Sequence, residues 1–199
     1  MKAVISDVPA DLLAERKRTG ADRWDEMWNG VLHMPPAPVI DHQDFEYQLE
    51  HWLRRHWGGP QGYRVYHNIN VASIGGWPHD YRVPDLVLVD SERFHIMHRE
   101  YFEGPPLVVI EIHSSGDEAY DKLEWYAALG IPETWIIDRD SCVPKVFVLN
   151  GRDYTERAPD ADGWFISRAS GIQLRTKRPK KLVLQLGDDA GTRAALPES

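Results

Sequence analysis

Two carboxylates stand in apolar surroundings that a soluble chain rarely gives to a charge. Asp85 follows Pro84 and opens the apolar run Leu86–Val89, and Glu111 lies inside the run 107–113. The second run is apolar at both alternating sets of positions, which is typical of a strand covered on both faces. Because an unpaired buried carboxylate is costly, Glu111 needs a cation, a metal ion or a proton beside it.

Carboxylate oxygens on neighbouring strands suit a hard divalent cation. Mg²⁺ and Mn²⁺ prefer oxygen ligands, and such an ion can polarise a phosphoryl oxygen and activate water. A purely structural reading remains for each residue, since Asp85 could cap a loop and Glu111 could pair with a neighbouring arginine. Both residues together favour a divalent metal site.

The spacing of these residues resembles the PD-(D/E)xK nuclease signature. Pro84-Asp85 is followed, after 25 intervening residues, by Glu111-Ile112-His113, with histidine where lysine is usual. The resemblance implies Asp85 and Glu111 as ligands of Mg²⁺ or Mn²⁺, joined by the backbone carbonyl of Ile112. It also implies a hydrolase, an endonuclease that cleaves the phosphodiester bonds of DNA.

Further segments resemble the Uma-type family of putative restriction endonucleases, over about residues 22–150. They are Glu26 with Asn29-Gly30, the proline-rich turn after it, His42, residues 120–127, Gly130-Ile131-Pro132-Glu133 and Trp135-Ile136-Ile137-Asp138. The resemblance implies an α/β fold with a restriction-endonuclease-like core, in which helices flank a central mixed β-sheet. It implies DNA as the partner, and a homodimer.

The cation that assists the attacking water has two candidates. Position 113 holds histidine, whereas a lysine there would orient the water and offset its developing charge. The family resemblance places the nearest lysine at Lys122, whose structural reading is a surface pair with Glu118, worth a few tenths of a kcal/mol. A neutral His113 could serve as a base or a ligand, or simply pack. Lys122 and His113 therefore join Asp85 and Glu111 as candidate catalytic residues.

Two other functions stay open. The absence of lysine at position 113 suggests a catalytically inactive nuclease-fold module that binds DNA or a protein partner. The nine histidines, with His95 and His98 at helical spacing, allow a histidine-metal enzyme of small molecules. Metal choice separates these readings, since a histidine site prefers Zn²⁺, Fe²⁺ or Ni²⁺. His42 could act in catalysis, cap the helix or hydrogen-bond a site residue. Glu46 and Glu50, one turn apart, could add a glutamate to the metal site or form a solvated face.

A mixed α/β domain must position these residues, and residues 1–190 are expected to form it. Asn29-Gly30 predicts the type I′ turn of an N-terminal β-hairpin over 26–34. A helix is expected from about Asp41, as its N-cap, to Trp57, ended by Gly58-Gly59-Pro60. The capping-box pattern of Ser115 with Glu118 predicts the start of another helix, ended by Gly130. Strands are expected at 63–71, 84–89, 107–113, 134–138 and 145–149, and near Tyr154, Phe165 and Leu182; residues 191–199 are expected to be a frayed tail.

The charge is uneven along the chain. The net charge of −8 divides into −3 for residues 1–60, −8 for 61–140 and +3 for 141–199. Such a chain is not expected to coat nucleic acid by bulk attraction, so phosphate must be met locally. The best candidate contact is the basic cluster Arg175, Lys177, Arg178, Lys180 and Lys181, although an edge strand also favours lysine.

The remaining global features indicate a cytoplasmic protein without a membrane partner. Cys142 is the single cysteine, which excludes an internal disulfide and a multi-thiolate zinc site. The apolar run at residues 3–5 is too short for the core of a signal peptide, and no stretch has the roughly 20 apolar residues that span a bilayer.

Overall fold

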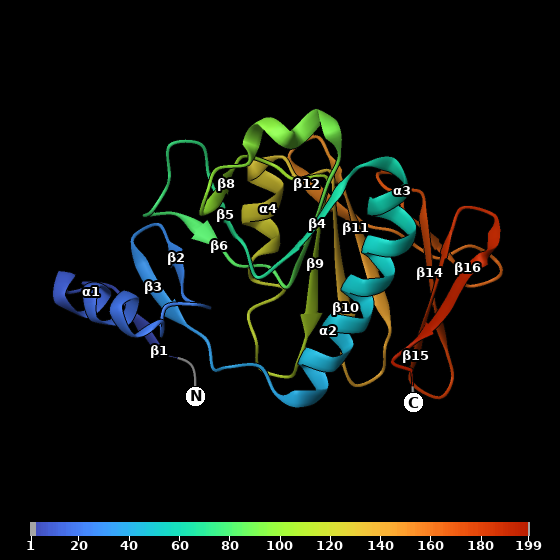
Figure 1. Ribbon diagram of the computed structural model, residues 1–199, viewed down its shortest axis with the longest axis horizontal. Coiled ribbons are helices and arrows are strands. Elements are labelled where there is room, and N and C mark those ends of the chain that lie inside the picture. Colours follow the sequence, from blue (N-terminus) through green and yellow to red (C-terminus); the bar gives the residue numbers. More distant parts are fainter. Residues whose placement is uncertain (1–2, 199) are drawn as a thin grey trace.

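A six-stranded mixed sheet forms the centre of the molecule and carries both predicted carboxylates (Figure 1). The computed structural model describes residues 3–198, so the ends of the predicted 1–190 domain and 191–199 tail at residues 1, 2 and 199 lie outside the described residues. In spatial order the strands are β12 (Asp153–Glu156), β11 (Pro144–Asn150), β10 (Glu133–Asp138), β9 (Val108–His113), β7 (Leu86–Val89) and β4 (Arg64–His67). Strands β9 and β10 run parallel, and the other neighbours run antiparallel.

Helices cover both faces of this sheet, as expected for the restriction-endonuclease-like core. Helix α2 (Ile40–Leu53) covers one face and α4 (Leu123–Leu129) the other, while the short α3 (Gly59–Gln61) follows α2 in the chain and α1 (Ala10–Thr19) lies beside β1 and β3 at the left of Figure 1. Successive side chains of β9 point to opposite faces. Ile110 packs in one cluster with Phe45 and Leu49 of α2, whereas Val109 packs with Tyr126 of α4. Helix α2 lies in front of the sheet in Figure 1.

The predicted N-terminal hairpin is confirmed and belongs to a second sheet. Asn29 and Gly30 have φ values of 49° and 84°, the positive pair that a type I′ turn requires. This second sheet contains, in spatial order, β1 (Ala3–Ile5), β3 (Val31–Met34), β2 (Glu26–Trp28), β6 (Tyr81–Arg82), β5 (Asn70–Ala72) and β8 (Tyr101–Glu103). The hairpin thereby places Glu26 next to the central sheet.

A third, antiparallel sheet lies at the C-terminal side, at the right of Figure 1. Its strands are β13 (Phe165–Ile166), β14 (Ile172–Lys177), β15 (Lys181–Leu186) and β16 (Asp189–Leu196). The expectation of a frayed tail is wrong for the described part of residues 191–199, because β16 pairs with β15 as far as Leu196. Leu196 is buried against the α2 side of the core, which explains the order of this segment.

The ends of the first long helix differ from the expectation. Val39, not Asp41, is the residue before the first helical turn, and Asp41 lies inside that turn. Gly58-Gly59-Pro60 does not end the helical path, which continues through a π-helical segment (Arg54–Gly58) and α3 to Gly62 at φ 70°. Pro60 is tolerated there because it lies in the first turn of α3, where an N–H has no helical partner.

Two further expectations are corrected. The capping box does not start a helix at Ser115, because α4 begins only at Leu123 and turns precede it. The carboxylate of Asp117 accepts hydrogen bonds from the N–H groups of Ser114 and Ala119, and this favours a turn. The single strand expected over 63–71 is two strands, β4 and β5, because Asn68 has a φ of 48° between them.

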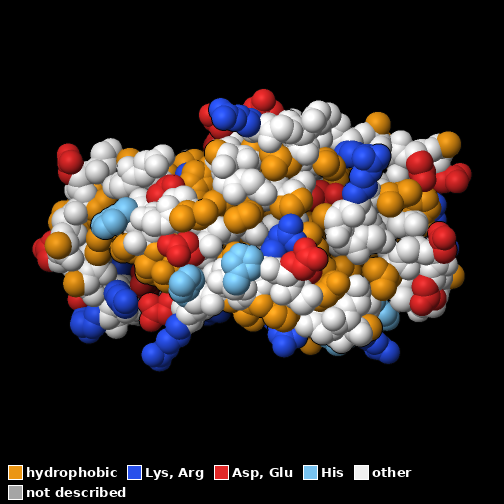
Figure 2. Space-filling view, turned by 90° about the horizontal axis from the view of Figure 1, so that it is seen from above, with side chains coloured by type: hydrophobic (Ala, Val, Ile, Leu, Met, Phe, Trp, Pro, Cys, Tyr) orange, Lys and Arg blue, Asp and Glu red, His pale blue; other side chains and the backbone are white. Residues whose placement is uncertain are grey.

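Charged side chains of both signs alternate with apolar ones on the face seen from above in Figure 2. Figure 2 looks onto the top of the molecule as drawn in Figure 1, whereas β9 ends toward the bottom. Within residues 3–198, no helix is long and apolar enough to cross a membrane.

Candidate metal centre

A cavity of about 260 Å³ opens where β7 begins and β9 ends. Three of the predicted residues line it, namely Asp85, Glu111 and Lys122, and the backbone neighbour Ile112 does so too. The charged and titratable residues around them are Glu26, His42, Asp117, Glu118 and Arg139. The structure thus brings most of the sequence-predicted set to one place.

Asp85 is positioned by the pairing of two strands. Leu86 is opposite Ile110 in the antiparallel pair of β7 and β9, so Asp85 lies beside the end of β9. The N–H of Ile112 donates to Asp85 Oδ2 at 2.6 Å, and His42 Nε2 lies 3.0 Å from Asp85 Oδ1. The carboxylate therefore connects the end of β9 to the first turn of α2.

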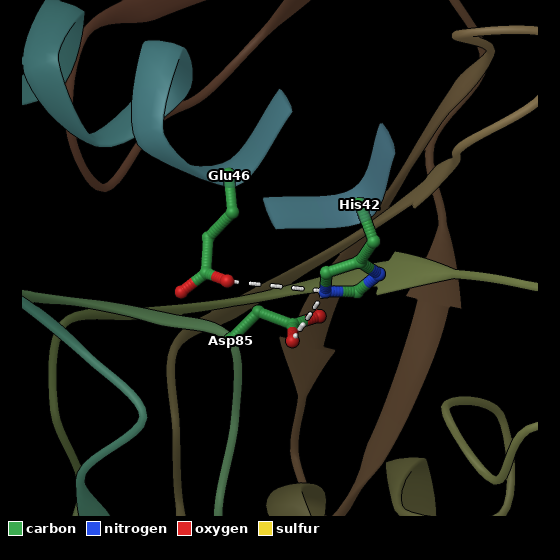
Figure 3. Close-up of side chains that lie close together, drawn as sticks. All are labelled: His42, Glu46 and Asp85. Carbon is green, nitrogen blue, oxygen red and sulfur yellow. Dashed lines mark hydrogen bonds and ion pairs between the residues drawn. The ribbon is translucent and has the colours of Figure 1, made fainter. Parts of the chain in front are cut away.

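Asp85 forms a compact group with two side chains of α2. His42 and Glu46 are one turn apart, and their ligand atoms and that of Asp85 all lie within 4.8 Å of one another (Figure 3). His42 Nε2 is 3.9 Å from Glu46 Oε2, and Asn68 donates to Glu46 Oε1 at 2.9 Å. The structure therefore places His42 and Glu46 beside Asp85, in place of a capping role or a solvated face.

Glu111 meets Lys122 on the other side of the sheet. Lys122 Nζ lies 3.1 Å from Glu111 Oε1 and 2.7 Å from Glu26 Oε1, and Tyr126 donates its hydroxyl hydrogen to Glu111 Oε1 at 2.5 Å. Glu26 also accepts the backbone N–H of Val83 at 2.9 Å. Lys122 is buried between two carboxylates. This differs from the exposed pair with Glu118 that was the alternative to a role in the site.

Burial controls protonation in this second cluster. Desolvation raises the pKa of Glu111 to about 8, and the nearby charges of Asp85 and Glu26 act in the same direction, against Lys122. Burial would lower the pKa of Lys122, but the carboxylates of Glu111 and Glu26 outweigh it and raise that pKa. Lys122 thus holds its proton at neutral pH and acts as a cation and hydrogen-bond donor.

Burial and neighbouring charges also shift the pKa values of His42 and Glu46, which lie beside Asp85. Desolvation, helped by the charge of Asp85, raises the pKa of Glu46 to about 7. Burial alone would lower the pKa of His42, but its contact with Asp85 and the charge of Glu46 raise it. Burial is the main cause at Glu111 and Glu46, and neighbouring carboxylates add to it; a divalent cation would offset this negative charge.

The donor set fits a hard divalent ion. Asp85 and Glu46 offer carboxylate oxygens and His42 offers one imidazole nitrogen within one close group, and Glu111 adds a carboxylate to the lining of the same cavity. Oxygen donors with a single histidine suit Mg²⁺ or Mn²⁺ better than the ions that histidine-rich sites prefer. Among residues 3–198, His42, Glu46 and Asp85 form the group of three side chains placed close enough to share one ion.

His113 does not line the cavity itself, although its partner Asp117 does. Its Nδ1 is 2.7 Å from Asp117 Oδ1, and its ring packs edge-on against Tyr120 with 5.0 Å between centroids. His113 stabilises the turn after β9, whereas Lys122 faces the carboxylates. Of the two candidates, Lys122 is thus the one whose side chain lies beside the carboxylates.

Sequence reasoning missed three contributors. Glu26 and Tyr126 enter the sequence analysis only within segments that resemble the family, and Arg139, which lines the cavity from the turn after β10, is not predicted at all. One signal for Glu26 was present, because a carboxylate in a short strand next to Met27 and Trp28 is unusual. Arg139 follows the end of a buried strand, where functional side chains often lie, but no spacing links it to Asp85.

Comparisons with known proteins bear on the family and the fold of the chain. The family model Uma2, described as a putative restriction endonuclease, matches residues 15–178. A crystal structure of a putative nuclease belonging to DUF820 from Anabaena variabilis superposes with a TM-score of 0.54 and 17% identity, covering 69% of this chain and 78% of that chain. No curated protein matches the chain.

Proposed function

The chain belongs to the Uma2 family of putative restriction endonucleases, and on this premise we propose that it is a divalent-metal-dependent endonuclease that hydrolyses DNA phosphodiester bonds. The carrying observation is the cavity at which Asp85, Glu111 and Lys122 meet at the ends of β7 and β9. Two carboxylates and one protonated lysine beside an accessible space are the parts that phosphodiester hydrolysis needs.

Each side chain has a role in the proposal. Asp85 and Glu111 hold Mg²⁺ or Mn²⁺, with the backbone carbonyl of Ile112 beside them. The ion, when bound, polarises the phosphoryl oxygen and eases deprotonation of the attacking water. His42 holds the Asp85 carboxylate from α2, and Glu46 extends the donor set on that side.

Lys122 supplies positive charge close to the reacting phosphate. Two of its three N–H donors are committed to Glu26 and Glu111, and its side chain lines the cavity. A third donor is thereby directed toward substrate. Because its pKa is raised, Lys122 stabilises negative charge rather than removing a proton from water.

Plasmid cleavage tests the proposal. Supercoiled DNA is incubated with Mg²⁺ or Mn²⁺ and with the wild-type chain, Asp85→Asn, Glu111→Gln or Lys122→Met. We expect cleavage by the wild type and a loss of about 100-fold or more in each variant, as for removal of a group that stabilises developing charge. The matched control is Glu92→Gln, which removes an exposed carboxylate from the 3₁₀-helical segment Ser91–Ile96. This variant should cleave DNA like the wild type.

Calorimetric titration with Mn²⁺ examines the site without any substrate. Asp85→Asn and Glu111→Gln should each weaken Mn²⁺ binding, while Glu92→Gln should leave it unchanged. Mn²⁺ binding without DNA cleavage would instead favour the catalytically inactive module that binds DNA or a protein. A homodimer, which the family resemblance implies, remains a proposal that light scattering can test.

A further inference from the structure

The turn between β14 and β15 carries a dense positive charge. Residues 163–187 contain six lysine or arginine side chains and no aspartate or glutamate. Lys177, Arg178 and Lys180 lie at the turn and are exposed. Arg178 and Lys180 stand at the turn itself and not along a strand edge, so protection of a sheet edge does not explain these two.

This basic turn contacts the turn that follows β10. The hydroxyl of Thr176 donates to the carbonyl of Cys142 at 3.3 Å, and Cys142 Sγ lies 3.3 Å from the carbonyl of Lys180. Both turns lie at the lower edge of Figure 1, the edge at which β9 ends. The basic turn is therefore on the cavity side of the molecule.

Arg139 lies between the basic turn and the cavity. Its backbone N–H donates to the carbonyl of His113 at the end of β9 at 2.9 Å, and its side chain lines the cavity. Its guanidinium also contacts Asp140 Oδ1 at 2.9 Å, but the Asp140 side chain is 65% exposed. Exposed ion pairs contribute at most about 1 kcal/mol, so a phosphate can replace Asp140 at little cost.

We propose that Arg139 and the exposed cations Lys177, Arg178 and Lys180 form one phosphate-binding surface that leads the DNA backbone into the cavity. This inference rests on the proposed function. The cavity itself is lined by Glu26, Asp85 and Glu111 and repels a polyanion in the absence of metal, so cations beside it are needed to hold the flanking phosphates.

Binding to a fluorescein-labelled DNA duplex of mixed sequence tests the surface, measured by anisotropy in EDTA over a series of salt concentrations. The test protein is the full chain with Lys177→Gln, Arg178→Gln and Lys180→Gln combined. A control chain carries Lys17→Gln, Arg99→Gln and Arg152→Gln, an equal charge change at exposed positions elsewhere. A separate Arg139→Gln chain examines the link to the cavity.

We expect the triple turn variant to bind DNA at least tenfold more weakly than the control. Because each phosphate contact contributes about 0.9 to the slope of log K against log salt, loss of three contacts should reduce the slope by about 2 to 3. Arg139→Gln should weaken DNA binding and reduce the slope by about 1. Mn²⁺ affinity should be unchanged in the triple turn variant.

Equal slopes of log K against log salt for the triple turn variant and the control would contradict the proposed phosphate-binding surface, even if the wild type cleaves plasmid. A loss of binding to phosphatidylserine vesicles, with DNA binding intact, would also overturn it in favour of a membrane partner. Failure of the wild type both to bind and to cleave DNA would overturn the proposed function together with this inference.

Discussion

At the residue scale, Lys122 and its two carboxylate partners depend on one another for their stability in the protein interior. Glu26, Glu111 and Lys122 are all buried, so removal of the lysine leaves two charges without a partner. Removing one member of a buried ion pair costs about 3–5 kcal/mol. Glu111 and Glu26 keep hydrogen bonds from Tyr126 and Val83 but lose their counter-charge, so we predict that Lys122→Met lowers the free energy of unfolding by roughly that amount, measured by chemical denaturation.

A double variant separates charge from packing at this position. In Lys122→Met with Glu26→Gln, one orphaned carboxylate is neutralised, and the loss of stability should be smaller than in Lys122→Met alone. Equal or larger loss in the double variant would contradict the triad of charges described by the structure.

The raised pKa of Glu111 determines how the free energy of unfolding should change with pH. Its pKa of about 8 in the folded protein lies above the ordinary value of 4.5, so the folded state binds more protons than the unfolded chain between these values. The free energy of unfolding of the metal-free protein should therefore fall as pH rises from about 5 to 8. Glu46, with a pKa of about 7, acts in the same direction up to that pH.

Thermal unfolding in EDTA at a series of pH values measures this effect. We expect the melting temperature of the wild type to fall between pH 5 and 8, and Glu111→Gln to fall less, because glutamine cannot ionise. A wild type and a Glu111→Gln variant with parallel pH curves would show that Glu111 does not titrate in this range.

At the scale of the element, the N-terminal hairpin presents Glu26 to Lys122. Its turn depends on Gly30, at a φ of 84° that residues with a Cβ rarely adopt. We predict that Gly30→Ala destabilises the protein by about 1–2 kcal/mol, whereas Gly30→Asn costs less, since asparagine tolerates this conformation. Denaturant unfolding of both variants checks this, and equal effects would mean that backbone strain is not the cause.

The elements that sequence predicted well are those fixed by nearby residues. Asn29-Gly30 determines a turn locally, and the short apolar strands around Asp85 and Glu111 are visible as runs. The capping-box pattern at Ser115 failed because the Asp117 carboxylate satisfies the competing N–H groups in a turn. Local competition of this kind is not visible in a spacing rule.

The candidate site was predictable only in part. Asp85, Glu111 and Lys122 lie within one stretch of 38 residues, so a motif can connect them. The contact of Glu26 with Lys122 spans 96 positions and depends on how the hairpin docks on the sheet. Arg139 reaches the cavity because β10 runs parallel to β9, a pairing that side-chain pattern alone does not determine.

On the scale of the whole molecule, we propose that an acidic chain binds its substrate through a metal ion and a local basic surface. The net charge of −8 and the clustered carboxylates favour cation binding. We predict that Mn²⁺ at about 100 times its Kd stabilises the protein by roughly 2.7 kcal/mol, as mass action requires for an ion bound by the folded state. The melting temperature should rise with Mn²⁺ and return to its starting value with EDTA.

The variants show whether such stabilisation comes from the proposed site. Asp85→Asn should lose most of the Mn²⁺-dependent rise, and Glu92→Gln should retain it. An equal rise in Asp85→Asn would place the ion elsewhere on the protein.

Metal-dependent cleavage of plasmid DNA by the wild type and by Glu111→Gln is the most direct measurement of the central claim. We predict that the wild type converts supercoiled DNA to nicked and linear forms with Mn²⁺, that EDTA abolishes the conversion, and that Glu111→Gln loses it while it remains folded. Cleavage by Glu111→Gln at the wild-type rate would contradict the assignment of this cavity as the active site.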